Sequence, residues 1–468
     1  MSAAAAPEGT MTEGAAPEGT MTEGAAPEST APESAAPEST APESAAPEST
    51  ALTALEERVL ALISESELVS LTSALVAAGG ENPGGTEEAT VDVLNTFCME
   101  AGLETTSAAV APGRPNFSAV LPGGAEPGFL FLGHSDVVPA GTGWERAPFE
   151  PFVRNGRLYG RGSTDMKGGL AAVAVAMKAL KEAGIQLPGD VALACTVDEE
   201  DLGMGIRAYT QTARTSLASL TGPGPSAEPS PASPFAYSAC VVAEPTDLET
   251  VIGCRGDSYI ELTVTGKSAH SGRPADGRNA IDATAKIMDL VRADHRRLQA
   301  SQDALLGAGS WNIGLIHGGT GTSMVAAECV VSLDRRLMPD EDAKVVLDQF
   351  RARITEAGID SDGISVQARV SMEMPGFRTP EDHPLVANAV NALASAGVES
   401  GIGGWTAACD GGFIARDLGV PTIVVGPGGL NDQAHQVNES VSIAELTAAA
   451  RAYALMCLRH QFAGPRNP

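Results

Sequence analysis

The chain has 468 residues, too many for one ordinary hydrophobic core, so we expect two or more domains. Its content of 43% hydrophobic and 19% charged residues is typical of a globular protein. The 30 Lys and Arg against 59 Asp and Glu give a net charge of −29, which argues against nucleic acid or an anionic membrane as a partner.

Residues 1–50 differ from the rest of the chain. The segment APEGTMTEGA occurs twice, and AAPESTAPES then recurs with the same ten-residue period. The stretch contains nine Glu but no aromatic residue, no Leu, Ile or Val, and no Lys or Arg. A solenoid needs apolar positions that stack from repeat to repeat, and these are missing. Because so little apolar surface can be buried, we expect a disordered acidic tail.

The chain from 51 to 254 alternates helices with apolar strands. Helical spacing of Leu, Val and Ile predicts a helix over 53–78, and another over 165–184 ends at a glycine. Apolar runs that end in polar residues predict buried strands at 128–136, 190–201 and 238–245. The Pro-, Ser- and Gly-rich residues 213–234 predict a mobile surface insertion. This pattern indicates an α/β domain with a mainly parallel mixed sheet, whose functional groups gather at the carboxyl ends of the strands.

The pattern changes over residues 255–371. Alternating residues at 259–266 predict a half-exposed strand. A helix, two strands, a helix and a strand follow, at 279–299, 311–317, 325–337, 341–357 and 364–372. This β-α-β-β-α-β order predicts a ferredoxin-like α+β domain inserted into the first domain. The α/β pattern then resumes over 372–463, with a helix at 384–396, a strand at 421–428 and a last helix at 442–459.

Five potential metal ligands follow apolar strands or lie at loop ends: His134, Asp165, Glu200, Glu244 and His435. A histidine and carboxylate set without thiolates suits zinc, cobalt or manganese. Buried carboxylates without basic neighbours are costly, and bound cations remove that cost. If five groups hold two ions about 3.5 Å apart, one carboxylate must bridge them.

Two further acids have distinct expected roles. Glu199 and Glu200 are adjacent, and neighbours in an extended segment point to opposite sides, so one can bind metal while the other faces the substrate as a general base. Asp136 lies two residues after His134, where its natural role is to accept the other imidazole N–H; capping a turn is the alternative.

Six ordered motifs carry a specific resemblance: HSDVVPAG (134–141), GRGSTDMKGG (160–169), TVDEEDLG (196–203), AEPTD (243–247), GKSAHSGRP (266–274) and DQAHQVNESV (432–441). Over residues 53–463 the chain resembles the dinuclear zinc aminoacylase/carboxypeptidase family. That family includes acetylornithine deacetylase, succinyl-diaminopimelate desuccinylase, aminoacylase and glutamate carboxypeptidase. The resemblance implies a zinc-exopeptidase-like catalytic domain and an inserted domain that serves as lid and dimerisation surface.

The resemblance also implies residue roles. One metal ion is expected on His134 and Glu244, the other on Glu200 and His435, with Asp165 bridging. Glu199 matches the general base, and Asp136 the partner of the first histidine. His270 matches a histidine that reaches the site of a partner subunit and polarises the scissile carbonyl. Arg336 matches an arginine that holds the substrate carboxylate, and Arg255 matches a second anion-binding position.

The sequence departs from the family at two positions. Met324 stands where some members have a substrate-binding Asn, and Ala408 where deacylases often have Thr. Both differences argue against specificity for succinyl-diaminopimelate, and neither affects the expected metal site.

The expected function is a metal-dependent amidohydrolase that removes the acyl group of an N-acyl amino acid through a metal-bridged water and Glu199. A dipeptidase or carboxypeptidase acting on small peptides is the alternative. A binding protein that kept the fold is disfavoured by the intact ligand set with Glu199. An aminopeptidase is disfavoured by Arg336 and His270, because recognition of a free amine needs no lid arginine.

Cysteine usage and the lack of targeting signals bear on location. The seven cysteines are scattered, odd in number and never in CxxC spacing, which disfavours a disulfide framework. No apolar run reaches the roughly 18–20 residues of a membrane-spanning helix, and no secretory signal is visible. We therefore expect a cytoplasmic protein, and the family resemblance implies that it is a homodimer.

Overall fold

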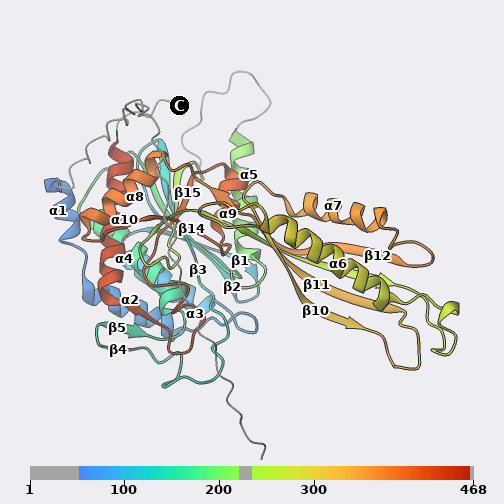
Figure 1. Cartoon of the computed structure of the whole chain (residues 1–468). Helices are drawn as coiled ribbons and strands as arrows, with labels where there is room; N and C mark the ends of the chain where they lie inside the picture. Colours follow the sequence, from blue (N-terminus) through green and yellow to red (C-terminus); the bar gives the residue numbers. More distant parts are fainter. Residues whose placement is uncertain (1–51, 221–234, 464–468) are drawn as a thin grey trace, which may run out of the picture. The chain divides into compact units, whose positions relative to one another are not determined.

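The computed structural model describes residues 52–220 and 235–463, and the predicted acidic tail lies outside the described residues. Two large sheets organise the chain (Figure 1). The larger has nine strands in the order β1-β2-β6-β3-β7-β15-β8-β13, with β14 paired to β8. Its strands are β1 Glu104–Ala111, β2 Arg114–Leu121, β3 Glu126–His134, β6 Gly189–Thr196, β7 Tyr237–Val242, β8 Thr250–Cys254, β13 Phe377–Arg378, β14 Ile402–Trp405 and β15 Thr422–Val424.

The centre of this sheet is parallel and buried on both faces. Strand β3 pairs in parallel with β6 and β7, and β15 pairs in parallel with β7, whereas β1 and β2 are antiparallel additions. Alternate residues of β3 enter two different cores: Phe129 and Phe131 pack on one face, Leu130 and Leu132 on the other. The mixed α/β class predicted from the sequence is confirmed.

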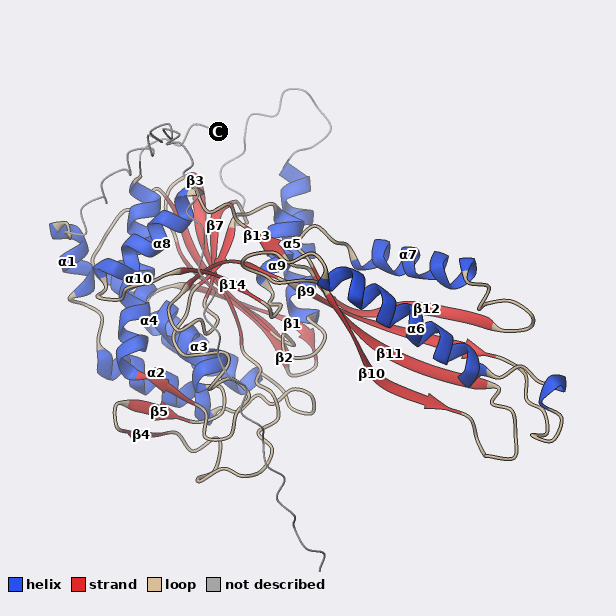
Figure 2. Ribbon diagram, viewed as in Figure 1, coloured by secondary structure: helices blue, strands red, loops and turns tan. Residues whose placement is uncertain are grey.

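Helices cover both faces of the nine-stranded sheet (Figure 2). The face that carries Phe129 and Phe131, called the first core, packs against six helices: α1 Ala54–Leu60, α2 Glu65–Ala77, α3 Glu88–Glu100, α4 Gly168–Glu182, α8 Pro384–Ser395 and α10 Ile443–Phe462. The opposite face carries α5 Met204–Leu220 and α9 Gly411–Leu418. A small sheet, β4 Phe152–Arg154, β5 Arg157–Tyr159 and β16 Ser440–Ser442, brings the segment before α10 beside residues 157–159.

The second large sheet has the order β10-β11-β9-β12, antiparallel throughout. It is formed by β9 Gly256–Thr265, β10 Ser310–Gly318, β11 Glu328–Leu337 and β12 Ser365–Met374, with helices α6 Ala280–Gln299 and α7 Ala343–Glu356. Ile260, Leu262 and Val264 of β9 pack against both helices, so the helices share one face. The other face presents Asp257 and Tyr259. The β-α-β-β-α-β order is the one predicted, and its last strand ends at residue 374 rather than 372.

Several predicted elements begin or end elsewhere in the structure, and two of these differences have a clear local cause. The helix expected over 53–78 is two helices, because Ser64 adopts an extended conformation and its side chain caps the first turn of α2. Residues 213–220, expected in a mobile insertion, form the end of α5, since the Pro- and Gly-rich composition begins only at Gly222. The remainder of that predicted insertion, 221–234, lies outside the described residues.

No single described helix is long and apolar enough to cross a membrane, whereas α1 and α2, bent by 49°, meet the requirements of length and composition only as a pair. Leu68, Leu71 and Leu75 of α2 are buried in the first core.

Candidate metal centre

The carboxyl ends of three neighbouring parallel strands deliver most of the predicted site. His134 is the last residue of β3, Glu199 and Glu200 follow the end of β6, and Glu244 follows the end of β7. Because β6, β3 and β7 are adjacent in the sheet, these side chains meet at one edge, as expected for an α/β fold. Asp165 comes from the irregular turn Ser163–Lys167 that leads into α4, and a cis peptide bond joins it to Met166.

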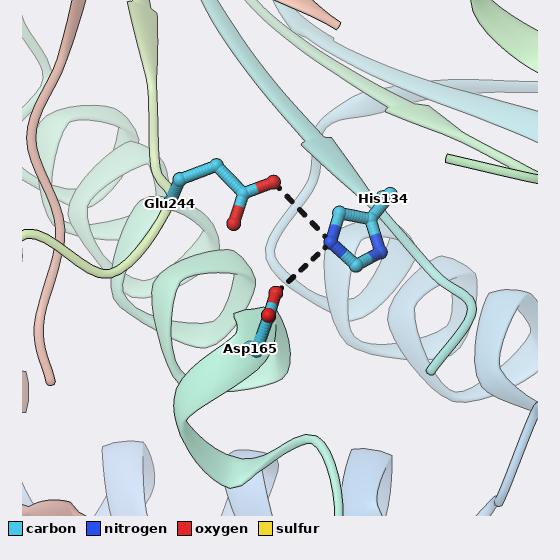
Figure 3. A group of neighbouring side chains, drawn as sticks. All are labelled: His134, Asp165 and Glu244. Atoms are coloured by element: carbon cyan, nitrogen blue, oxygen red, sulfur yellow. Dashed lines mark hydrogen bonds and ion pairs between the residues drawn. The ribbon is translucent and has the colours of Figure 1, made fainter. Parts of the chain in front are cut away.

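A first group of ligand atoms lies around the ring of His134 (Figure 3). Its Nε2 is 3.2 Å from Asp165 Oδ1 and 3.2 Å from Glu244 Oε1. Its Nδ1 is 3.0 Å from the backbone oxygen of Asp136, so we assign the N–H to Nδ1 and leave a lone pair on Nε2. Three buried acceptors then converge with no donor between them, which is the arrangement that a bound cation stabilises.

A second group shares Asp165 with the first. His435 Nε2 lies 3.1 Å from Glu200 Oε2 and 3.3 Å from Asp165 Oδ2. The other oxygen of Glu200 is buried and has no hydrogen-bond partner among the described residues. The two oxygens of Asp165 thus face the two groups separately, so this donor set fits two divalent ions with Asp165 between them.

The electrostatics of the cluster favour added positive charge. Burial, together with the charges of Asp165 and Glu200, raises the pKa of Glu244 to about 8. Burial also raises the pKa of Glu199 well above its usual range, with Glu244 and Asp410 adding to the effect. Hydrogen bonds to Asp165 and Glu200 raise the pKa of His435 to about 10. Several carboxylates held this close require protons or metal ions between them.

Asp136 connects the two groups through the backbone. It is fully buried, its Oδ1 lies 3.4 Å from His134 Nδ1, and it accepts hydrogen bonds from the backbone N–H groups of Glu199 and Glu200. Asn82 donates to its Oδ2 over 2.9 Å. Asp136 is therefore placed to orient the histidine and the two following glutamates together. Sequence reasoning missed Asn82, which lies 54 residues away in a loop without a recognisable motif.

Glu439 was also missed, although it lies within the motif that contains His435. Its buried carboxylate accepts hydrogen bonds from the backbone N–H groups of Gly162, Thr164 and Asp165 and pairs with Arg161 at 2.7 Å. It therefore fixes the turn that presents Asp165. The sequence did offer a signal for this pair, because Arg161 and Glu439 lie in two motifs that were both assigned to the same site.

One cavity of about 260 Å³ adjoins both ligand groups. Among its lining residues are Asp165, Glu199, Glu200, Asp201, Glu244, Asp257, Tyr259, Arg336, Met372, Met374, Trp405, Ala407, Ala408, Leu430 and His435. Glu199 thus opens onto the same space as the candidate ligands, as a general base requires. Arg336 reaches the cavity from strand β11 and pairs with Asp257 and Asp334.

Two predicted residues lie elsewhere. Arg255 is not among the residues described as lining the cavity; its guanidinium donates to the backbone oxygens of Thr406 and Ala308. His270 is exposed in a loop after β9, forms an isolated bridge with Met324, and accepts a hydrogen bond from the N–H of Gly272. Asp257 lines the cavity and Thr265 ends the same strand, about 26 Å further on at 3.3 Å per residue. His270 therefore lies far from the site of its own chain.

Comparisons with known proteins identify the family and the fold. The model of the family described as "Peptidase family M20/M25/M40" matches residues 130–459. Acetylornithine deacetylase of Vibrio campbellii is 29% identical over 361 residues, which are 75% of this chain and 86% of that protein. Succinyl-diaminopimelate desuccinylase of Xanthomonas euvesicatoria is 31% identical over 342 residues, 71% and 83% of the two chains. The M20 family metallo-carboxypeptidase Sso-CP2 of Sulfolobus solfataricus has the same fold, with a TM-score of 0.66, 21% identity and coverage of 84% and 98%.

Proposed function

The chain belongs to peptidase family M20/M25/M40 and is a hydrolase of amide bonds, and within that class we propose that it removes the acyl group from an N-acyl amino acid. The observation that carries the proposal is the placement of Asp165 between two ligand groups that open, with Glu199, onto one cavity. A dipeptidase or carboxypeptidase is the second candidate, favoured by the likeness of the fold to a metallo-carboxypeptidase.

We assign His134 and Glu244 to one ion, Glu200 and His435 to the other, and Asp165 to both. Zinc suits this donor set best, and cobalt or manganese are the other candidates. When bound, the two ions would polarise the scissile carbonyl and lower the pKa of the attacking water.

Glu199 is the general base in this proposal. Its carboxylate takes a proton from the attacking water and then gives that proton to the leaving amine nitrogen. Burial and neighbouring carboxylates raise the pKa of Glu199, so it can hold the proton between the two steps. Asp136 acts through the groups that it orients: the ring of His134 and the backbone that carries Glu199.

Substrate binding is assigned to Arg336. Two of its nitrogens, Nε and Nη2, are held by Asp334 and Asp257, whereas Nη1 has no hydrogen-bond partner among the described residues. Nη1 is therefore available to the carboxylate of the substrate. Arg255 donates to two backbone oxygens, so a role in anion binding would require it to leave them.

We assign His270 to the active site of a second subunit. The length of β9 separates it from its own cavity, which supports action across a dimer. The edge strand β10 carries the exposed apolar residues Leu315 and Ile316, which supports association of the inserted domains as a lid and dimerisation unit. All seven cysteines are free thiols, which supports a reducing compartment such as the cytoplasm.

The test is a hydrolysis screen with purified full-length protein and metal analysis of the same sample. N-acetyl amino acids, N-succinyl amino acids and unblocked dipeptides form the three arms. Turnover of N-acyl amino acids above dipeptides supports the deacylase, the reverse order supports the second candidate, and absence of turnover in all arms with two ions bound would refute both.

A further inference from the structure

The turn that carries Glu199 and Glu200 is closed by the residue before them, Asp198. Its backbone oxygen accepts a 2.6 Å hydrogen bond from the N–H of Gly203, and its side-chain Oδ2 accepts one of 3.2 Å from the N–H of Met204. Its φ of 66° lies in the left-handed region, which is costly for a residue other than glycine unless surrounding contacts hold it. The position of Glu199 therefore depends on the partners of the Asp198 side chain.

The other carboxylate oxygen of Asp198 is held from outside the turn. Oδ1 lies 3.0 Å from Asn82 Nδ2 and 3.0 Å from Arg114 Nη1, and the side chain is only 1% exposed. The same amide nitrogen of Asn82 donates to Asp136, so two buried carboxylates share one neutral donor. Buried carboxylates this close are stable only with positive charge beside them. Asp136 faces His134, and Arg114 supplies the charge for Asp198.

Arg114 is itself fixed in place. It is the first residue of β2, and its side chain is largely buried. Its Nε donates to the two oxygens of Glu87 over 3.0 and 2.8 Å, and its Nη2 pairs with Glu87 as well. This arrangement leaves Nη1 directed at Asp198. The guanidinium thus connects a rigid strand and a buried acid to the turn after β6.

The same strand also holds both ends of that turn. Two residues after Arg114, the side chain of Asn116 accepts a 3.1 Å hydrogen bond from the N–H of Val197 and donates one of 2.8 Å to the backbone oxygen of Gly205. Residues two apart lie on the same face of a strand. One face of β2 therefore serves as the frame of the turn, with a neutral contact at its ends and a charged contact beside Glu199.

We propose that Arg114 is a positioning residue for hydrolysis, which acts through Asp198 on the turn that carries Glu199. Arg114 is not among the residues described as lining the cavity, so its loss should remove no contact with the substrate. A small displacement of a proton-transferring group is enough to slow a reaction about 10²-fold. The inference rests on the proposed function, because it takes Glu199 as the general base.

The experiment uses the full-length, metal-loaded protein and the N-acyl amino acid or dipeptide that the wild type hydrolyses fastest. Arg114→Ala should lower kcat by about 10- to 100-fold while KM stays within about threefold and two ions per chain remain bound. Metal content and the free energy of unfolding are measured on the same samples. An unchanged kcat, or a rise in KM that accounts for the whole loss of kcat/KM, would overturn the inference. Recovery of wild-type turnover on addition of zinc would overturn it too, because Arg114 would then act on metal binding.

A double-mutant cycle tests the route through Asp198. Asp198→Asn keeps the shape of the side chain and removes its charge, so it should lower kcat to a similar degree. If Arg114 acts through Asp198, the double variant Arg114→Ala/Asp198→Asn should have a kcat within about threefold of the slower single variant. Losses that multiply would show that Arg114 acts independently of Asp198, which contradicts the proposal.

Arg459→Ala is the matched control for a loss of stability alone. Arg459 pairs with Glu56 at 2.7 Å, and this pair is partly buried like that of Arg114. The ring of the next residue, His460, lies 5.0 Å from that of Phe129, which is about 16 Å from the end of β3 at 3.3 Å per residue. The control should lose stability and keep the wild-type kcat. An equal fall of kcat in both variants would attribute the effect to stability and overturn the inference.

A second variant covers the case in which Arg114→Ala does not fold. In Arg114→Lys the charge is kept, but an ammonium group lacks the planar fork that reaches Glu87 and Asp198 together, so kcat should fall by about 3- to 10-fold. An unchanged kcat would then overturn the inference. Wild-type protein that binds two ions and hydrolyses no screened substrate overturns the proposed function and the inference with it. Wild-type turnover that Arg114 variants leave unchanged overturns the inference alone.

Discussion

The carboxylate of Glu439 accepts a 3.0 Å hydrogen bond from the backbone N–H of Asp165, although 274 residues separate them in the chain. Further bonds from the turn and a 2.7 Å pair with Arg161 make Glu439 the main anchor of that turn. The residue proposed to bridge two metal ions is thus held by its backbone, which leaves both of its side-chain oxygens directed at the ligand groups.

We predict that Glu439→Gln destabilises the protein and weakens metal binding together. The amide leaves the buried Arg161 without its charge partner, and breaking a buried pair in this way costs about 3–5 kcal/mol. Urea unfolding and metal titration measure the two effects. Glu145→Gln is the control, because the Glu145–Arg154 pair is about half exposed and screened by solvent, so its loss should hardly change the stability. Equal effects of the two variants would contradict the anchoring role.

The adjacent acids Glu199 and Glu200 should differ in what their loss removes. Glu199→Gln is expected to keep both ions and lose about 10²- to 10⁴-fold in turnover, because proton transfer fails. Glu200→Gln is expected to weaken binding of one ion, since its Oε2 contacts His435. Metal analysis and kcat on the same samples distinguish them. Loss of metal from the Glu199 variant with near-normal activity on reconstitution would exchange the two assignments.

The strand pattern allowed much of this arrangement to be anticipated. Apolar runs that end at His134 and shortly before Glu200 and Glu244 are parallel neighbours in the sheet, so the meeting of these residues follows from topology. Glu439 and Asn82 act through backbone and amide contacts across long sequence separations, which no local pattern encodes. The position of Arg255 outside the described lining of the cavity could not be predicted either, because its guanidinium donates to backbone oxygens of loops that are distant in the sequence.

The stability of the inserted domain should depend on pH through one buried acid, Asp294. Burial alone would raise the pKa of Asp294, but hydrogen bonds from Arg297, Arg353 and Trp311 lower it to about 2. Because the folded-state pKa is below the usual 3.8, the contribution is present above pH 4 and is lost as the pH falls from about 4 to 2.

Asp294→Asn should therefore lower the free energy of unfolding by about 2 kcal/mol at pH 7, and by less towards pH 3. Denaturant titrations of both proteins at several pH values measure this difference. Asp289→Asn on the same helix, where the pair with Arg292 is exposed, is the control. A difference that does not shrink as the pH falls would contradict the ionic origin of the effect.

Action of His270 across a dimer predicts complementation. His270→Ala and Glu199→Gln should each lose turnover with both ions retained. A mixed dimer then contains one site with its own Glu199 and an intact His270 from the neighbour, so part of the activity should return. Activity is measured against the proportion of the two variants after subunit exchange. Verified mixed dimers without recovered turnover would show that His270 does not act in the neighbouring site.

The central claim is that this chain hydrolyses N-acyl amino acids with two metal ions held by His134, Glu244, Glu200 and His435 around Asp165. A titration of metal-depleted full-length protein with zinc, with turnover followed at each addition, tests it most directly. The account predicts no turnover without metal and a maximum at two ions per chain. Undiminished turnover by the metal-depleted protein, or saturation at two ions without hydrolysis of any N-acyl amino acid, would contradict it.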